Sequence, residues 1–186
     1  PPEERIVGPL RMLVIEPAQL GFVAHATGAS TSESMTMDTL EREVGSSIYG
    51  AIDGPMWGDC DASRSTCRLL RFGAIDRMRG IHIESRHPEQ GMTLSVVPGI
   101  LGARAVASPG WSPAPFARVA IQLYPRLVQN GETVAVQPNE QRTRAAVGIL
   151  SDGRVALVIS DPMENTEFAR RLRDAHVVNA GYTDGG

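Results

Sequence analysis

The chain reads RTRAAVGILSDGRVALVISDPMENTEFARRLRDAHVVNAGYTDGG from Arg142 to Gly186, and this stretch decides the fold. Two apolar runs, Ala145–Leu150 and Val155–Ile159, flank the turn sequence Ser151-Asp152-Gly153-Arg154. Asp-Gly between two such runs predicts a β-hairpin, in which both central residues must tolerate a positive φ. The stretch therefore begins with two antiparallel strands.

The second half of this stretch predicts a helix and a further strand. Asp161-Pro162 ends the second strand, because proline cannot donate to a strand ladder. Asn165 or Thr166 caps a helix over Glu167–Ala175, whose apolar residues recur at helical spacing. Val177–Gly181 is the next expected strand. We therefore expect an α/β (α+β) fold, with a mixed, largely antiparallel sheet and a few flanking helices, in a single domain over residues 1–186.

Further strands are expected at Arg11–Ile15, Thr93–Val97 and Arg118–Leu123. Residues 98–115 are rich in Gly, Ala, Pro and Ser, which predicts a long surface loop. The sequence Ile81-His82-Ile83-Glu84 alternates strictly, so His82 and Glu84 share one strand face. That pair is either an acid/base pair or part of a solvated face, and the solvated face is the preferred interpretation.

Carboxylates stand where two apolar runs end, at Asp161 and Asp184. Gly185 and Gly186 follow Asp184, and two glycines permit positive φ and a close approach of backbone N–H groups to an anion. The alternative is that Asp-Gly-Gly is only a turn. Both interpretations stay open on spacing alone.

This closing stretch resembles the phosphodiester glycosidase family, the group that includes the lysosomal "uncovering" enzyme. That enzyme removes N-acetylglucosamine from a phosphodiester on mannose 6-phosphate. The family typically shows Arg-Thr-Ala-Val-Gly, a hairpin, a strand ending in Asp, a helix, and a strand ending Asn-Leu-Asp-Gly-Gly-Gly-Ser. Here Arg144–Gly148, Asp161 and Asp184-Gly185-Gly186 stand in matching order and spacing.

Two earlier blocks carry the same resemblance. Ala51-Ile52-Asp53-Gly54-Pro55-Met56-Trp57 is similar to the family sequence Ala-Ile-Asn-Gly-Gly-Met-Phe, with Asp53 in place of a site asparagine. Tyr124-Pro125-Arg126-Leu127-Val128 with Gly131 is similar to Gly-Pro-x-Leu-Val-x-x-Gly, and Asn130-Gly131 predicts a turn. The three blocks, at residues 47–57, 122–131 and 142–186, span most of the chain.

The resemblance implies a hydrolase that cleaves a sugar from a sugar-phosphodiester, and therefore a carbohydrate or sugar-phosphate substrate. It implies that Asp161 and Asp184 are catalytic, since glycoside cleavage needs an acid and a base or a stabilising carboxylate. Arginine suits phosphate because its planar fork binds two oxygens at once. The expected substrate- or phosphate-binding residues are Arg144, Arg126, Asp53, Gly54, Trp57, Gly185 and Gly186, with Arg142 as a further candidate and Trp111 either stacking on a sugar or packing in the fold.

Departures from the family pattern leave two alternatives open. Asp53 and Tyr182 replace family asparagines, and the chain stops after Gly186, before the third Gly and the Ser. One alternative is a non-catalytic member that binds an anionic glycan or a protein partner. The other is altered chemistry, in which Asp53 holds a divalent cation; otherwise we expect no cofactor and no metal. Pro1-Pro2-Glu3 opens without a methionine, so we expect a chain truncated or processed at both ends.

Composition excludes several other functions. The net charge is −3 and the pI is near 5.8, which gives no reason to expect nucleic-acid binding. No apolar run is long enough to span a bilayer. All 18 basic residues are arginine, so neither a Schiff-base lysine nor a P-loop lysine is available. The sequence does not indicate an oligomeric state.

The two cysteines, Cys60 and Cys67, bracket six residues. They are either independent thiols or a short-loop disulfide, and the disulfide is the preferred interpretation. A zinc site would need more ligands at tighter spacing. A disulfide would place the protein in an oxidising compartment, so we expect a secreted or periplasmic location.

Overall fold

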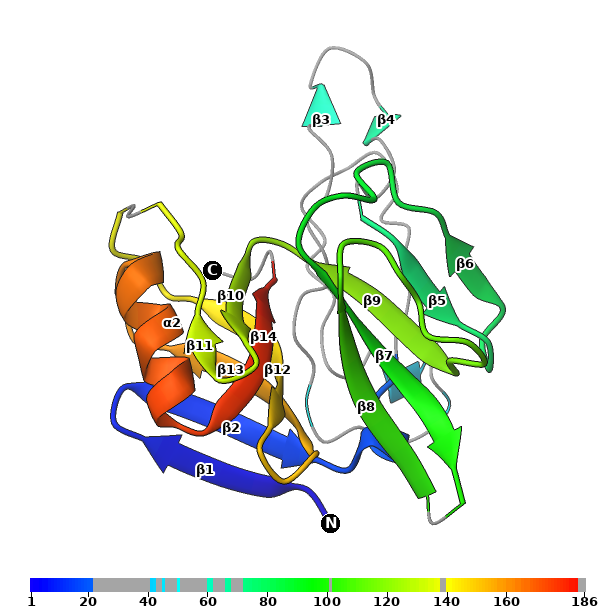
Figure 1. Cartoon of the computed structure of the whole chain (residues 1–186), viewed down its shortest axis with the longest axis horizontal. Coiled ribbons are helices and arrows are strands. Elements are labelled where there is room, and N and C mark those ends of the chain that lie inside the picture. Colours follow the sequence, from blue (N-terminus) through cyan, green and yellow to red (C-terminus); the bar gives the residue numbers. More distant parts are fainter. Residues whose placement is uncertain are drawn as a thin grey trace.

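The computed structural model describes residues 1–21, 41–42, 45, 50, 60–61, 66–67, 72–100, 102–137 and 140–183. Its largest sheet has seven strands (Figure 1). In spatial order they are β1 (Glu3–Val7), β2 (Leu10–Ile15), β13 (Val155–Ser160), β12 (Ala145–Leu150), β14 (Val177–Tyr182), β10 (Arg126–Gln129) and β11 (Glu132–Thr133).

A second sheet has five strands, and a separate ribbon has two. The five are, in spatial order, β6 (Ile81–Ile83), β5 (Ala74–Asp76), β9 (Val119–Leu123), β7 (Met92–Gly99) and β8 (Gly102–Pro109). The ribbon pairs β3 (Cys60–Asp61) with β4 (Thr66–Cys67). Helical elements in the described part of the chain include the 3-10 turn η1 (Pro17–Gln19) and the α-helix α2 (Asn165–Asp174).

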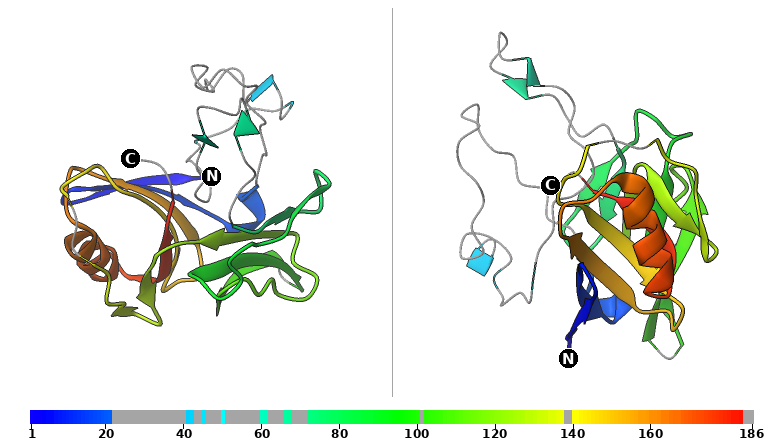
Figure 2. Two further views of the ribbon diagram at one scale, coloured as in Figure 1. Left: turned by 90° about the horizontal axis from the view of Figure 1, so that it is seen from above. Right: turned by 90° about the vertical axis from the view of Figure 1, so that its left-hand side faces the viewer.

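The sheets and the helix form three layers. Figure 2 shows the seven-stranded sheet curving around α2, with the five-stranded sheet on its other side. The alternation of side chains along β12 explains this arrangement. Ala146 and Leu150 belong to the core shared with Phe168 of α2, whereas Val147 and Ile149 belong to the core shared with the five-stranded sheet. All six residues of β12 are buried, as expected for a central strand covered on both faces.

The expected α+β fold class is confirmed, and every strand pairing in the described part of the chain is antiparallel. The predicted hairpin joins β12 to β13, with Ile149 opposite Val155. The turn chemistry was only half right, because Gly153 has a positive φ of 88° but Asp152 does not. The connection has four residues, and one left-handed position suffices to close it.

The predicted loop over residues 98–115 was wrong. β7 continues to Gly99, and β8 follows from Gly102 to Pro109 and pairs with β7 from Met92↔Pro109 to Gly99↔Gly102. Small side chains misled the prediction, since Ala and Gly have low strand propensity on average. In this strand the alanines alternate, and Ala103, Ala105 and Ala107 pack on the core between the sheets.

The helix prediction was right in position but not in its cap. Glu164, and neither Asn165 nor Thr166, is the N-cap of α2, and its side chain makes no capping hydrogen bond. Phe168, Ala169 and Leu172 form the buried face.

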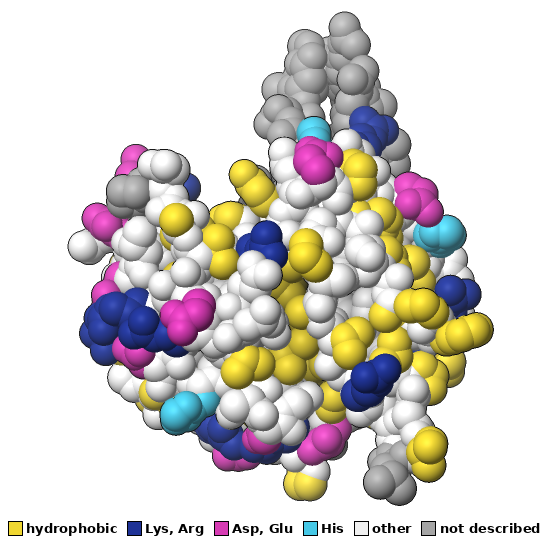
Figure 3. Space-filling model, in the orientation of Figure 1, with side chains coloured by type: hydrophobic (Ala, Val, Ile, Leu, Met, Phe, Trp, Pro, Cys, Tyr) yellow, Lys and Arg dark blue, Asp and Glu magenta, His cyan; other side chains and the backbone are white. Residues whose placement is uncertain are grey.

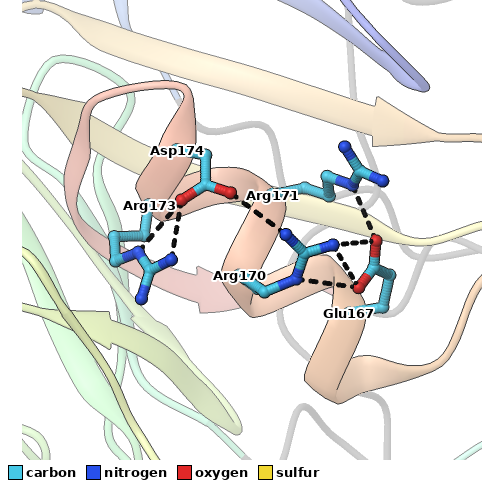
Figure 4. Close-up of polar contacts among 5 residues, drawn as sticks. All are labelled: Glu167, Arg170, Arg171, Arg173 and Asp174. Carbon is cyan, nitrogen blue, oxygen red and sulfur yellow. Dashed lines mark hydrogen bonds and ion pairs between the residues drawn. The ribbon is translucent and has the colours of Figure 1, made fainter.

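The outer face of α2 carries a chain of ion pairs (Figure 4). Glu167 accepts from both Arg170 and Arg171, at 2.6 and 2.7 Å. Asp174 accepts from Arg173 and Arg170, at 2.7 and 3.3 Å. Both carboxyl groups have a lowered pKa because of these arginine hydrogen bonds. Pairs of opposite charge three and four residues apart on one helix face support the helix.

Candidate functional site

The ends of four neighbouring strands meet along one side of the seven-stranded sheet. We call this set the strand-end rim: Pro125–Arg126, Tyr182–Thr183, Arg144–Ala145 and Ser160–Asp161. Backbone hydrogen bonds fix its order. Tyr182 N–H donates to Pro125 O at 2.9 Å, Thr183 N–H to Ala145 O at 3.0 Å, and Ser160 N–H to Arg144 O at 2.9 Å.

The antiparallel register explains why residues far apart in the sequence meet here. β12 and β10 begin at the rim, whereas β13 and β14 end there. Two expected arginines, Arg126 and Arg144, and one expected carboxylate, Asp161, therefore lie at the same end of the sheet. β13 is three strand spacings from β10, so the backbones of Asp161 and Arg126 stand about 14 Å apart.

Arg144 is buried, with only 3% of its surface exposed. Its Nε donates to Met163 O at 3.0 Å, its Nη1 to the Tyr182 hydroxyl at 3.4 Å, and its Nη2 to Glu140 O. The guanidinium also lies over the Tyr182 ring, 5.8 Å from its centre. Arg144 therefore joins the segments before β12, after β13 and at the end of β14, and its predicted contact with phosphate is untested.

Asp161 is exposed at the rim, and its backbone N–H donates to Pro9 O at 3.0 Å. The described part of the chain stops at Thr183, the residue before Asp184. The other expected site residues, Asp53, Gly54, Trp57, Asp184, Gly185 and Gly186, all lie outside the described residues. The expected convergence of Asp53, Asp161 and Asp184 beside Arg144 is therefore a prediction, except that Asp161 and Arg144 do share the rim.

Arg126 lines an open cleft of about 420 Å³. Its Nη1 donates to Gln129 Oε1 at 2.8 Å. Its Nε is buried and has no hydrogen-bond partner among the described residues. A buried N–H without a partner is costly in a native protein, which makes it a candidate for binding a ligand. The full lining of the cleft is Gly91, Tyr124, Pro125, Arg126, Val134, Ala135, Val136, Gln137 and Asn165.

Arg142, the further phosphate candidate, lies on the surface. Its Nη2 and Nε both contact Glu140 Oε2, at 2.5 and 3.1 Å. The hydrogen bond from Arg142 lowers the pKa of Glu140, and the same contact raises the pKa of Arg142. An exposed pair of this kind contributes little to stability, and it already occupies the guanidinium.

The solvated-face interpretation of His82 and Glu84 agrees with the structure. Both side chains are exposed, and His82 Nε2 lies 2.8 Å from Glu84 Oε1. Trp111 Nε1 donates to the other carboxylate oxygen of Glu84 at 3.1 Å. The Trp111 ring also covers Gly73, where an added Cβ would lie 2.4 Å from ring atoms. Of the two interpretations of Trp111, packing is the one that these contacts favour.

Cys60 is the Cα partner of Cys67 in the β3–β4 register. A cross-strand pair has Cα separations of about 4.5–5.5 Å, within the range that disulfides use. The disulfide itself remains a prediction. Among the described residues, no group of three or more His, Cys, Asp and Glu could hold a metal ion, and no helix is long and apolar enough to cross a membrane.

Sequence reasoning missed part of the cleft. Tyr124 and Gln137 were not expected as site residues, and Asn165 was expected only as a helix cap. Tyr124 follows directly on β9 of one sheet and precedes the start of β10 in the other, so its exposure depends on how the two sheets pack. No pattern in the neighbouring sequence predicts how the two sheets pack.

Comparison with known proteins supplies the remaining evidence. Residues 80–186 match the protein family described as phosphodiester glycosidase (NAGPA). A search of curated proteins found no relative.

Two solved structures match this chain. The first is the zebrafish N-acetylglucosamine-1-phosphodiester alpha-N-acetylglucosaminidase catalytic domain auto-inhibited by its pro-peptide, with 19% identity and a TM-score of 0.51 over 72% of this chain and 50% of that chain. The second is a hypothetical protein from Synechocystis, with 13% identity and a TM-score of 0.49 over 100% of this chain and 56% of that chain. The chain thus spans about half the length of each structure that it resembles.

Proposed function

The chain belongs to the phosphodiester glycosidase family, and from this premise we propose that it hydrolyses sugar-phosphodiesters, releasing the free sugar. The observation that carries the proposal is the strand-end rim. It brings Arg126 and Asp161 to the same end of the sheet. β14, the strand that precedes Asp184 in the sequence, also ends there.

Phosphate recognition falls to Arg126 in this proposal. Its side chain lines the cleft, and its buried Nε lacks a partner among the described residues. Asn165, the first residue of α2, lines the same cleft, so the positive end of a helix faces the same space. An arginine fork beside a helix N-terminus suits a phosphodiester anion.

Arg144 has a different part in the proposal, because its guanidinium is buried and already donates to two carbonyl groups. We assign it as a positioning residue, which holds Tyr182 and the segment around Met163 in place. Tyr182 ends β14 only two residues before Asp184, so a loss of this support would reach the catalytic carboxylate.

The reaction breaks the bond between the anomeric carbon and the phosphate oxygen. Water supplies a hydroxyl to the anomeric carbon, and its remaining proton goes to solvent or to the departing phosphate monoester. Positive charge develops on the sugar ring, so a carboxylate is needed to stabilise it or to activate the water. A phosphate is a good leaving group, so protonation of the leaving oxygen contributes less. We assign the main carboxylate role to Asp184, since β14 is the direct neighbour of β10 and Asp161 lies two strands further.

The test is release of free sugar from synthetic sugar-1-phosphodiesters by the wild type and by three variants. Asp184→Asn should lower kcat about 100-fold or more, and Asp161→Asn should lower it less. Asp152→Asn removes an exposed carboxylate at the other end of β12 and is the matched control, with no expected loss. Equal activity of Asp184→Asn and wild type would refute the proposal. Binding of these compounds without any turnover would favour a non-catalytic glycan-binding protein instead.

A further inference from the structure

An aromatic ring stands beside Arg126 in the cleft, and a buried ring supports it from behind. Tyr124 is 39% exposed. It stacks on the buried Phe72, with ring centroids 5.6 Å apart and 20° between the ring planes. His87 packs against the same Phe72 ring at 6.1 Å. Because Phe72 is fixed in the fold, the exposed part of the Tyr124 ring is a rigid apolar wall with a polar tip.

Gly91 keeps backbone, and no side chain, next to this wall. It has a positive φ of 67°, and an added Cβ would lie 2.0 Å from Leu123 O and 3.2 Å from the Tyr124 Cβ. A side chain is therefore excluded both by conformation and by space. Gly91 therefore contributes only backbone to the lining of the cleft beside Tyr124.

The rest of the cleft complements the ring. Val134 and Val136 supply apolar surface, and Gln137 and Asn165 supply amide groups. In the face shown in Figure 3, charged side chains gather over α2, and hydrophobic side chains gather over the five-stranded sheet. The cleft lies between these regions, because Asn165 belongs to α2 and Tyr124 follows β9 of the five-stranded sheet.

A cation, a flat apolar wall and amides in one cleft match the three parts of a phosphorylated pyranose. Its anion suits Arg126, its face of C–H groups suits an aromatic ring, and its hydroxyls suit amides. We infer that Tyr124 and Arg126 form the subsite for the leaving half of the substrate, with a pyranose ring on Tyr124 and its phosphate on Arg126. The inference rests on the proposed function for the direction of cleavage, and it makes Tyr124 the residue that selects a ring over an acyclic alcohol.

The experiment measures the affinity of glucose 6-phosphate and of glycerol 3-phosphate by calorimetry. The two ligands carry the same phosphate monoester, but only the first has a ring. We expect the wild type to bind glucose 6-phosphate about five- to tenfold more tightly. Tyr124→Phe should keep that preference, and Tyr124→Leu should abolish it while leaving the affinity for glycerol 3-phosphate unchanged. Arg126→Gln should weaken both ligands by the same factor.

Saturation-transfer NMR on the wild type needs no variant, so it tests the inference even if Tyr124→Leu fails to fold. Saturation concentrated on one face of the sugar ring supports stacking. Equal affinities for the two ligands, or a ring preference that survives in Tyr124→Leu, would overturn the inference. Uridine 5′-monophosphate carries a flat base in place of a pyranose. If it bound more tightly than glucose 6-phosphate, the cleft would favour a nucleotide, and the inference would be overturned.

The outcome separates this inference from the proposed function. If the protein prefers the ring ligand but releases no sugar, the Tyr124–Arg126 subsite is supported and the proposed hydrolase activity is refuted. If it releases sugar but shows no ring preference, the hydrolase activity is supported and the subsite is refuted.

Discussion

The Arg144 guanidinium lies over the Tyr182 ring, with its central carbon 5.8 Å from the ring centre. A side chain directly before β12 thus covers a side chain at the end of β14, next to the residues expected to do chemistry. Cation–π contact and hydrogen bonds from the same guanidinium hold the two strand ends together. One buried arginine therefore adds side-chain contacts to the backbone hydrogen bonds that order the strand-end rim.

Replacing Arg144 by lysine should destabilise the protein by about 2–4 kcal/mol. A lysine keeps the charge, but a single ammonium group cannot donate hydrogen bonds to Met163 O and Glu140 O and also lie over the Tyr182 ring. Urea unfolding measures the change. Arg142→Lys, two residues away on the surface, is the matched control and should change stability far less. Equal effects of the two variants would show that Arg144 has no special role in the rim.

Trp111 is expected to act in packing and not in sugar binding. Gly73→Ala should displace the Trp111 ring, because the new Cβ would lie 2.4 Å from it, and should cost about 1–3 kcal/mol. In a Trp111→Ala background the same change should cost much less, which a double-mutant cycle detects. Additive costs would mean that the two residues do not share this contact. A loss of ligand affinity in Trp111→Ala at unchanged stability would favour a sugar-binding role.

The N-terminal strand should lose support in acid. Hydrogen bonds from Arg5 and Arg154 hold the pKa of Glu3 at about 2, below its ordinary value of 4.5. A group whose pKa is lower in the folded state stabilises the fold above its unfolded pKa, and that contribution is lost as the pH falls through the folded pKa. Glu3→Gln should therefore have a lower Tm than wild type at pH 7, and this difference should shrink as the pH falls below 4.5 and be small by pH 2.

The Glu3 effect should be modest, because the group is exposed and salt screens it. Glu4→Gln removes the same charge from the same strand and is the control. If the Tm difference from wild type followed the same pH course in both variants, the ion pairs of Glu3 would not be its cause.

The two cysteines lead to a prediction about the cellular compartment of the protein. Cys60 and Cys67 stand opposite each other in the β3–β4 register, and we propose that they form a disulfide in a secreted or periplasmic protein. The intact mass of unreduced protein should be lower by two hydrogens than that of the reduced protein. Two thiols that react with an alkylating agent before reduction would exclude the disulfide and remove the reason for this location.

Local signals were enough to predict the closing hairpin, helix and strand. Asp152-Gly153 between two continuous apolar runs predicted β12 and β13, and apolar residues at helical spacing predicted α2. It failed at β8, where small side chains become a strand only because β7 lies beside them. The candidate site, like the fold, was only partly predictable from the sequence. Arg144, Asp161 and Arg126 were expected as site residues because their motifs resemble those of the family, but the burial of Arg144 and the exposure of Tyr124 depend on long-range packing. Such contacts leave no mark on neighbouring positions in the sequence.

The most direct test of the central claim compares two substrates of the same sugar, a phosphodiester and an uncharged aryl glycoside. The claim is that the strand-end rim recognises the phosphate through Arg126. Arg126→Gln should lower kcat/KM for the phosphodiester about 100-fold and leave kcat/KM for the aryl glycoside unchanged. An equal loss on both substrates, or no loss on the phosphodiester, would contradict the account.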